Sequence, residues 1–358
     1  MIIFDLLIAL QKAVKGKRQK ASVIPFLFNQ EKELIQLCSE LQTQAWRPGG
    51  YRTFKIYDPK ERNISAAPFR DRVVHHYLCL LIEPIFEKTF IHDSYANRIG
   101  KGTHKAINRF QYFARRYPFV LKCDIKKFFP SLDHEILKRE IRWRVKDAHA
   151  LWLWNTIIDG SNPQEEVMGY FQGDDLFSPI ERKRGLPIGN LTSQFWANVY
   201  MNRFDHFVKE VLQVKGYIRY VDDFVLFANT KMEIHEYQKA ITHYLDGIRL
   251  QLHPRKTQLY RVQDGVPFLG FRVFPYYRYV LKEKTKRYKR FLKKKIKYYQ
   301  AGKITPAELE NAINAWLGHI RFGQSQRLEY QVFWILRNAG INVHRHPNGA
   351  WKILEIKK

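Results

Sequence analysis

Hydrophobic and polar residues follow two patterns along the chain, one typical of amphipathic helices and the other of buried or half-buried strands. Apolar residues three or four positions apart predict helices over residues 30–45, 71–87, 133–146, 147–158, 191–212 and 232–247. Short apolar runs predict strands at residues 119–125, 256–262 and 266–274. Strand-forming segments on either side of a turn predict two hairpins, at residues 51–69 and 216–228. Strands interspersed with helices in this way are typical of an α+β fold.

The two ends of the chain carry positive charge on predicted helices. The first 20 residues predict an amphipathic helix with a basic end, and Asp5 interrupts its apolar run, which argues against a signal peptide. Residues 282–297 hold ten Lys and Arg against one acid, Glu283, and their apolar residues keep helical spacing. Two more amphipathic helices are predicted near residues 305–321 and 325–338. We therefore expect a separate, basic helical module in the C-terminal part.

Composition extends this picture to the whole chain. Its 358 residues contain 61 Lys and Arg against 34 Asp and Glu, a formal net charge of +27. Such an excess indicates a polyanionic partner, with nucleic acid first and an anionic membrane surface second. There is no run of about 18 apolar residues, so we expect no membrane span. Three distant cysteines without a CxxC pair argue against a zinc ribbon or a disulfide framework and favour a reducing, cytoplasmic location.

Acidic residues interrupt or end two of the apolar, strand-forming segments. Asp222 and Asp223 lie between the two halves of one predicted hairpin, and Asp124 ends another apolar run. A carboxylate at such a position is costly to bury unless it is paired or bound to a metal. The two acid sites could meet at one edge of a sheet and hold two Mg²⁺ ions for phosphoryl transfer. The alternative is that Asp222 and Asp223 make an ordinary solvated hairpin turn.

Seven sequence blocks resemble, in order and spacing, the motifs of reverse transcriptases. They are residues 69–74 and 94–98 for the fingers, residues 124–129, 185–194 and 220–223 for palm motifs A, B and C, and residues 252–257 and 268–271 for motifs D and E. The resemblance implies an α+β right-hand polymerase fold, with an antiparallel palm sheet packed on helices and a helical thumb. Its parts would be an N-terminal helical extension (1–50), fingers (51–118), a palm with some fingers elements (119–275) and a basic thumb (276–358).

The resemblance also implies roles for the predicted acid site. Asp124 and Asp222 would be the principal ligands of two Mg²⁺ ions, which Mn²⁺ could replace, with Asp223 as a third carboxylate nearby. The carbonyl oxygen of Ile125 is expected at the same ions. Lys256 in motif D is either a general acid for pyrophosphate release or a simple surface lysine.

Other residues are expected to bind the incoming nucleotide. Phe129 matches the aromatic gate that excludes a ribose 2′-hydroxyl, which implies deoxynucleotide substrates; the alternative is an ordinary core Phe. Lys55 and Arg62 are candidates for gripping the triphosphate, and a solvated role is equally open for each. Three neighbouring cations compete for this assignment: Lys60, Arg70 and Arg72.

Template RNA and the cDNA–primer duplex would be held by motif E and the basic thumb. The candidate contacts are Phe268, Leu269, Gly270, Lys286, Arg287, Lys289, Arg290, Lys293 and Lys294. Lysines along a helix contact phosphates without reading the sequence, so binding should weaken steeply with salt. A solvated basic helix and a membrane-surface helix are the alternatives.

Motif B departs from the form common in reverse transcriptases, Gln-Gly-x-x-x-Ser-Pro. Here Ile188 replaces the Gln and Gln194 replaces the Pro, on either side of Gly189. An Ile side chain neither donates nor accepts a hydrogen bond, so we expect weaker discrimination between correct and incorrect base pairs. The Ile-Gly-x-x-x-Ser-Gln form resembles the reverse transcriptases of diversity-generating retroelements, which are bacterial or phage-encoded.

That closer resemblance implies a function and a partner. Such enzymes copy a template-repeat RNA into cDNA with frequent errors opposite adenine, and the cDNA rewrites a variable repeat in a target gene. They bind a small, basic accessory variability protein. The short chain agrees, since we expect no maturase or endonuclease extension after the thumb.

Other functions stay open at this point. A general bacterial reverse transcriptase, of the group II intron or retron type, would share every block except the unusual motif B. A non-catalytic, RNA-binding scaffold of the maturase type would not need Asp124, Asp222 and Asp223. A viral RNA-dependent RNA polymerase is disfavoured by Phe129 and by Tyr-Val-Asp-Asp where that class usually has Gly-Asp-Asp.

Overall fold

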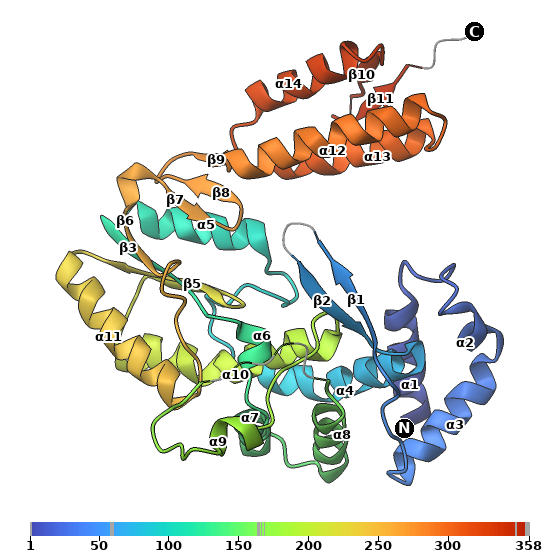
Figure 1. Ribbon diagram of the computed structural model, residues 1–358, viewed down its shortest axis with the longest axis vertical. Helices are drawn as coiled ribbons and strands as arrows, with labels where there is room; N and C mark the ends of the chain where they lie inside the picture. The colour runs from blue at the N-terminus through green and yellow to red at the C-terminus, as the bar shows by residue number, and fades with distance from the viewer. Residues whose placement is uncertain are drawn as a thin grey trace. The chain divides into compact units, whose positions relative to one another are not determined.

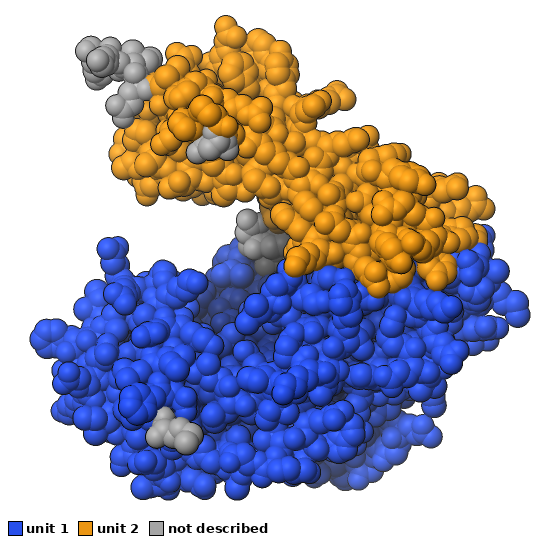
Figure 2. All heavy atoms as spheres, turned by 180° about the vertical axis from the view of Figure 1, so that it is seen from behind, with its two compact units in different colours: residues 1–102, 121–259 blue, residues 103–120, 260–358 orange. Residues whose placement is uncertain are grey.

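The computed structural model describes residues 2–57, 61–162, 165, 167, 169–347 and 349–354 (Figure 1). The chain divides by its internal contacts into two units, which Figure 2 colours separately. Unit 1 comprises residues 1–102 and 121–259, and unit 2 comprises residues 103–120 and 260–358. This division groups residues 103–120 with the C-terminal part of the chain, so its boundaries differ from those of the expected fingers, palm and thumb, which stay a prediction.

Helix α10 (Leu191–His206) forms the centre of unit 1. Twelve of its residues are buried, on every side of the helix, as expected for a helix surrounded by protein. It packs against α4 (Phe69–Glu87) and α7 (His134–Arg144). In turn, α4 contacts α1 (Ile2–Val14) and α8 (Ala148–Asp159). The other helices of unit 1 are α2 (Ile24–Phe28), α3 (Gln30–Gln42), α6 (Phe128–Ser131), α9 (Ser178–Glu181) and α11 (Lys231–Gly247).

Aspartate caps set where two of these helices begin. The side chain of Asp133 accepts hydrogen bonds from the backbone N–H groups of Glu135 and Ile136 at the start of α7. Asp147 accepts one from the N–H of Ala150 at the start of α8. Each cap satisfies backbone donors that the helix itself leaves free, which typically contributes about 1 kcal/mol. The helices predicted near residues 133 and 147 therefore start where the sequence supplies a cap.

A four-stranded sheet carries the acidic residues. Its strands lie in the order β4 (Tyr217–Tyr220), β5 (Asp223–Ala228), β3 (Phe119–Asp124) and β6 (Gln258–Arg261). Strands β4 and β5 pair antiparallel, and β5 is buried from its second residue to its last. Helix α11 contacts β5. A second, largely exposed hairpin of unit 1 pairs β1 (Arg52–Ile56) with β2 (Arg62–Ala66).

In the residues that the structure describes, unit 2 combines small antiparallel sheets with four α-helices. Its elements are α5 (Thr103–Ala114), β7 (Val266–Phe268), β8 (Phe271–Val273), β9 (Arg278–Val280), α12 (Lys282–Gln300), α13 (Pro306–Ile320), α14 (Gln326–Arg337), β10 (Val343–Arg345) and β11 (Trp351–Ile353). Thr305 and Glu308 form a capping box that starts α13. Helices α12 and α13 pack together, and the ring of Tyr288 stacks on that of Trp316 with centroids 3.8 Å apart.

The α+β class and most predicted elements are confirmed, with a few local differences. The helix predicted over residues 191–212 continues as a π-helical turn after His206. The strand predicted over residues 266–274 is a hairpin, because Leu269 and Gly270 have positive φ and turn the chain. The predicted strands and turn at residues 51–69 include 58–60, which lie outside the described residues. All three cysteines are free thiols, and no helix in the described part of the chain is long and apolar enough to span a bilayer.

Candidate active site

Asp124, Asp222 and Asp223 lie where neighbouring strands end or begin. Asp124 is the last residue of β3, and Asp223 is the first residue of β5, its neighbour in the sheet. Tyr220 pairs with Asp223, so the turn between β4 and β5 contains only Val221 and Asp222. One acid, Asp222, thus lies on a tight hairpin turn, Asp223 follows it at the start of β5, and Asp124 ends the adjacent strand β3.

The three carboxylates affect one another electrostatically. Burial first, and then the negative charges of Asp223 and Asp124, raise the pKa of Asp222 to about 6. Burial also raises the pKa of Asp223; the positive charge of Lys122 opposes this rise and the negative charge of Asp124 adds to it. Partly buried acids that repel one another are a strained arrangement, and added positive charge would relieve it.

Lys256 supplies part of that positive charge. Its Nζ lies 2.6 Å from Oδ1 of Asp124. Two backbone hydrogen bonds bring this segment to the end of β3: the N–H of Lys126 donates to Gln251 O at 2.8 Å, and the N–H of His253 donates to Asp124 O at 2.7 Å. The motif D lysine is therefore an ion-pair partner of the motif A aspartate, and 43% of its side chain is exposed.

Motif B is tied by its backbone to motif A and to the β1–β2 hairpin. The N–H of Leu186 donates to Phe129 O at 3.0 Å, and the N–H of Ser65 on β2 donates to Ile188 O at 3.1 Å. Gly189 has a φ of 117°, and a Cβ at this position would lie 3.0 Å from Cγ2 of Ile64. A glycine is required at this position, where motif B passes close to β2.

The aromatic and polar candidates of motifs A and B differ in their exposure. Phe128 is buried and contacts the ring of Phe129 edge-on, with centroids 5.5 Å apart. Phe129 and Ile188 are half-buried, and Gln194 is exposed on the first turn of α10. Phe128 is thus a core residue, while Phe129 keeps part of its surface available to a ligand.

The triphosphate candidates lie on the exposed β1–β2 hairpin. Lys55 Nζ is 2.7 Å from Oε1 of Glu61, and the hydrogen bond to this carboxylate raises the pKa of Lys55. Arg62 is exposed. Arg70 pairs with two glutamates of α3, and Arg72 donates to a backbone carbonyl. These partners give Arg70 and Arg72 structural roles; Lys60 lies outside the described residues.

The motif E candidates occupy the β7–β8 hairpin of unit 2. Phe268 is 1% exposed and stacks on Phe110 with centroids 5.1 Å apart, so it belongs to the core of this unit. Leu269 and Gly270 form the turn. Gly270 has a φ of 93°, and a Cβ there would overlap the side chain of Lys284 on α12. Of the three residues, only Leu269 and Gly270 have surface for a primer contact.

The expected duplex contacts on α12 form its polar face. Thr285, Tyr288, Leu292 and Ile296 are the buried positions of this helix. Lys289 is half-buried. The other five candidate cations are exposed: Lys286, Arg287, Arg290, Lys293 and Lys294.

The donor chemistry of the acids and their grouping bear differently on a metal site. In residues 2–354, apart from the undescribed positions, no three His, Cys, Asp or Glu side chains are grouped closely enough to hold a metal ion. The donor set nevertheless suits a hard cation, because it consists of carboxylates, which Mg²⁺ prefers. The ammonium group of Lys256 already lies against Asp124 as a cation.

Comparison with known proteins then shows the family of this chain. The model of the reverse transcriptase (RNA-dependent DNA polymerase) family matches residues 57–273, more than half of the chain. The chain belongs to the reverse transcriptase family. This membership confirms the expected enzyme class, RNA-directed DNA polymerase, and the matched range contains the acids, motif B and the β7–β8 hairpin.

Relatives within the family include proteins of group II introns. Protein YkfC of Escherichia coli is 28% identical over 67% of this chain and 71% of its own length. The group II intron-encoded protein LtrA of Lactococcus lactis is 22% identical over 51% of this chain, which spans only 29% of LtrA. Among solved structures, one of telomerase from Candida albicans with a telomeric RNA fragment is similar to this chain. The match covers 75% of this chain and 55% of the telomerase chain, at 12% sequence identity and a TM-score of 0.44.

Sequence reasoning missed some residues that lie around the candidate site. Lys122 lies two positions before Asp124 on β3, and its charge lowers the pKa of Asp223. A lysine within an apolar strand, on the same face as the acid that ends it, was the available signal. Arg219 and Asp205 were also missed, although a buried arginine in an apolar strand requires an acceptor.

Proposed function

We propose that the chain copies RNA into DNA with Asp124, Asp222 and Asp223 as its metal-binding carboxylates. The observation that carries this proposal is that Asp124 ends β3 next to β5, which Asp223 begins after the turn that holds Asp222. There, burial and the charges of Asp223 and Asp124 raise the pKa of Asp222 to about 6. In a purely structural role such repulsion only destabilises the fold. In a polymerase, divalent cations offset it.

Two bound Mg²⁺ ions would activate the primer 3′-hydroxyl and stabilise the leaving pyrophosphate. Asp124 and Asp222 would hold these ions, with Asp223 as a third carboxylate and Ile125 contributing its carbonyl oxygen. Lys256 would then lose Asp124 as its partner. Its ammonium group, on a partly exposed side chain, would be free to donate a proton to the pyrophosphate.

The deoxynucleotide would bind beside Phe129, Ile188 and Gly189. The hydrogen bonds of Phe129 O and Ile188 O to neighbouring segments support a rigid pocket wall. Phe129 would exclude a ribose 2′-hydroxyl by its bulk. Lys55 would exchange Glu61 for a phosphate oxygen, which is a small change for two exposed groups.

Template RNA and the cDNA–primer duplex would bind through phosphate contacts. The exposed cations of α12 and the turn at Leu269 and Gly270 are the candidate surfaces in unit 2. Such contacts provide affinity for any sequence, which suits an enzyme that must move along its template.

Motif B supports a more specific role, that of a diversity-generating retroelement. Ile188 offers no side-chain hydrogen bond beside the expected nucleotide, so the shape of the base pair alone would select it. Errors opposite adenine would then rewrite a variable repeat of a target gene. A small basic accessory protein would be the partner of such an enzyme.

The experiment is to copy a defined RNA that contains all four bases and to sequence the cDNA. We expect wild-type errors to concentrate opposite template adenine, and Ile188→Gln to reduce them several-fold, because a new hydrogen bond of about 1 kcal/mol corresponds to about fivefold discrimination. Ile188→Leu is the matched control, since it keeps the site apolar and should keep the error spectrum.

The outcomes separate the levels of the proposal. Errors spread evenly over the four bases would refute the retroelement assignment and leave the polymerase intact. No cDNA at any Mg²⁺ or Mn²⁺ concentration would refute the polymerase itself. Faithful copying would favour the second candidate, a group II intron-type reverse transcriptase, which the similarity to LtrA supports.

A further inference from the structure

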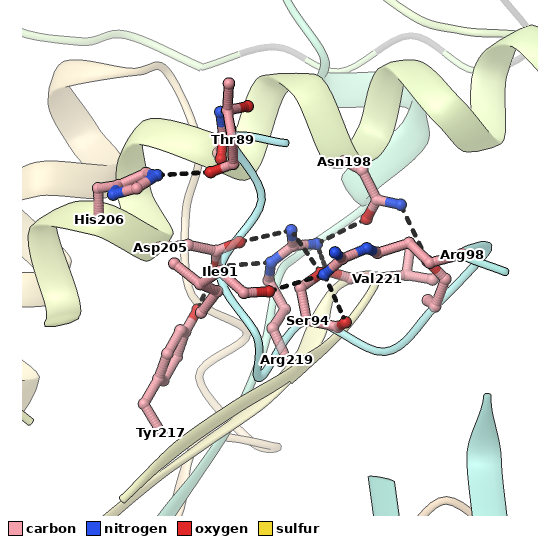
Figure 3. Close-up of polar contacts among 12 residues, drawn as sticks. Thr89, Ile91, Ser94, Arg98, Asn198, Asp205, His206, Tyr217, Arg219 and Val221 are labelled. Atoms are coloured by element: carbon pink, nitrogen blue, oxygen red, sulfur yellow. Dashed lines mark hydrogen bonds and ion pairs between the residues drawn. The ribbon is translucent and has the colours of Figure 1, made fainter. Parts of the chain in front are cut away.

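A fully buried arginine contacts the turn that carries the acids (Figure 3). The side chains of Arg219 on β4 and of Asp205 on α10 have no exposed surface. Nε and Nη2 of Arg219 each donate to one oxygen of Asp205, both at 2.7 Å. Nη2 also donates to Ser94 Oγ at 3.2 Å, and Nη1 donates to Asn198 Oδ1 and to Val221 O, both at 3.1 Å. All five N–H groups of the guanidinium are therefore used.

The bond to Val221 lies at a strained point of the backbone. Val221 has a φ of 59°, in the left-handed region that a β-branched residue rarely adopts. It is the first of the two turn residues, and glycine or asparagine usually takes positive φ in such a turn. A donor fixed at the Val221 carbonyl therefore stabilises a conformation that the side chain at this position disfavours.

The arginine is itself held from α10. Asp205 and Asn198 are seven residues apart on this helix, close to two turns, and both reach Arg219 (Figure 3). The Nδ2 of Asn198 donates on to Ala96 O at 2.9 Å, and the hydroxyl of Tyr217 donates to Oδ1 of Asp205 at 2.7 Å. The turn is thus connected, through one guanidinium, to the helix that motif B begins.

Stability alone is a poor reason for this arrangement. Replacing a buried ion pair by apolar residues of similar volume is often neutral or stabilising. What a planar, two-pronged arginine–carboxylate pair adds is orientation, because its hydrogen bonds fix direction as well as distance.

We propose that Arg219 is a positioning residue, which holds the strained Val221 turn so that Asp222 and Asp223 present their carboxylates to a divalent cation. This inference rests on the proposed function for the role of the acids. It adds a residue that does not touch metal or nucleotide and acts only through the turn.

The test measures metal affinity separately from DNA synthesis. Arg219→Lys keeps the charge and loses the fork that bonds Asp205, Asn198 and Val221 together. We expect Mn²⁺ binding, followed by electron paramagnetic resonance, to weaken about 10-fold. We expect kcat to fall about 10- to 100-fold per folded molecule, because small displacements of reacting groups have effects of this size. KM for the template RNA should not change.

Tyr217→Phe is the matched control. It removes a hydrogen bond to the same Asp205 carboxylate and leaves all five guanidinium donors in place. Its melting temperature should fall, while Mn²⁺ affinity and kcat per folded molecule should match the wild type.

Two further variants test the proposal independently, and Asn198→Ala does so even if Arg219→Lys does not fold. Asn198→Ala removes one acceptor beside Val221 O and should lower Mn²⁺ affinity about 3- to 10-fold. Val221→Gly relieves the backbone strain of the turn. Where the double variant Val221→Gly/Arg219→Lys folds, Arg219→Lys should therefore lower Mn²⁺ affinity less in the Val221→Gly background than in the wild type.

Mn²⁺ affinity that is unchanged in Arg219→Lys and Asn198→Ala would overturn the proposal. The proposal would also be overturned if total activity in these variants and in Tyr217→Phe fell only as much as the amount of folded protein, with kcat per folded molecule unchanged. Suppose that Mn²⁺ affinity depends on Arg219 as expected and that the wild type nevertheless makes no DNA. This result would refute the proposed function and leave the positioning role standing.

Discussion

The β4–β5 hairpin of unit 1 and helix α12 of unit 2 use charge in opposite ways. At the hairpin, Arg219 and Asp205 are fully buried and fixed by hydrogen bonds, and Asp222 is partly buried beside other acids. On α12 the cations lie on the solvent side and only Thr285, Tyr288, Leu292 and Ile296 are buried. One region holds a few charges in set positions, while the other presents many charges on flexible side chains.

This difference indicates in which region the loss of a single charged residue has a large effect. Charges in a desolvated site interact strongly at short range, so the loss of one removes a function. Exposed cations are screened by salt and act as a sum, so the loss of one changes affinity by a step. Substitutions in the two regions should therefore differ in the size and the sign of their effects.

The largest effect is expected at the hairpin. Asp222→Ala should lower primer extension about 1,000-fold or more, because a lost metal ligand removes several kcal/mol of transition-state stabilisation. Binding of a primer–template duplex, measured by fluorescence anisotropy, should remain within about twofold. Glu236→Ala, an exposed acid on α11, is the control and should keep full extension. Extension that survives Asp222→Ala would move the metal site elsewhere.

A graded effect is expected on α12. Replacing Lys286 and Lys293 by Gln should weaken duplex binding about 10- to 30-fold near physiological salt and reduce the slope of log affinity against log salt by about 2. Replacing Lys32 and Lys239, two exposed lysines of unit 1, removes the same charge and is the control. Equal losses in the two double variants would mean that net charge, not α12, determines binding.

The smallest effect has the opposite sign to the first. The pKa of Asp222 is raised, so its ionised form destabilises the fold above about pH 6, and this cost disappears as the pH falls below the usual carboxyl range. Without metal, Asp222→Asn should therefore raise the free energy of unfolding by about 1 kcal/mol at pH 7.5 and leave it unchanged near pH 4. Urea titrations at the two pH values, in the presence of a chelator, measure this difference. A variant less stable than the wild type at pH 7.5 would contradict the account of repelling acids.

Much of the fold could be predicted because local pattern and tertiary packing agree. The apolar stripe of α4, the buried run of β3 and the two halves of the β4–β5 hairpin each match their elements. The pattern of apolar and polar residues did not predict the shortest elements. Helices α6 and α9 have four residues each, too few for a helical period, and the β7–β8 turn depends on positive φ at Leu269 and Gly270.

The sequence indicated which residues belong to the candidate site, but not which of them contact one another. The acids of motifs A and C were identified from residues that ended or interrupted apolar runs. The ion pair of Lys256 with Asp124 joins residues 132 positions apart, and only the folded backbone sets that distance. For the same reason the sequence contains Arg219 and Asp205 without indicating that they meet.

The ion pair between Lys256 and Asp124 has a consequence for how the proposed metal ions would bind. An internal counterion lets the acids fold into place without waiting for a dissolved cation. Metal binding at Asp124 would then be an exchange, in which the Lys256 ammonium group leaves the carboxylate as the metal ion arrives. Such an exchange would make the free energy of metal binding less favourable than the three acids alone would give, so the proposed ion would be able to leave after each nucleotide is added.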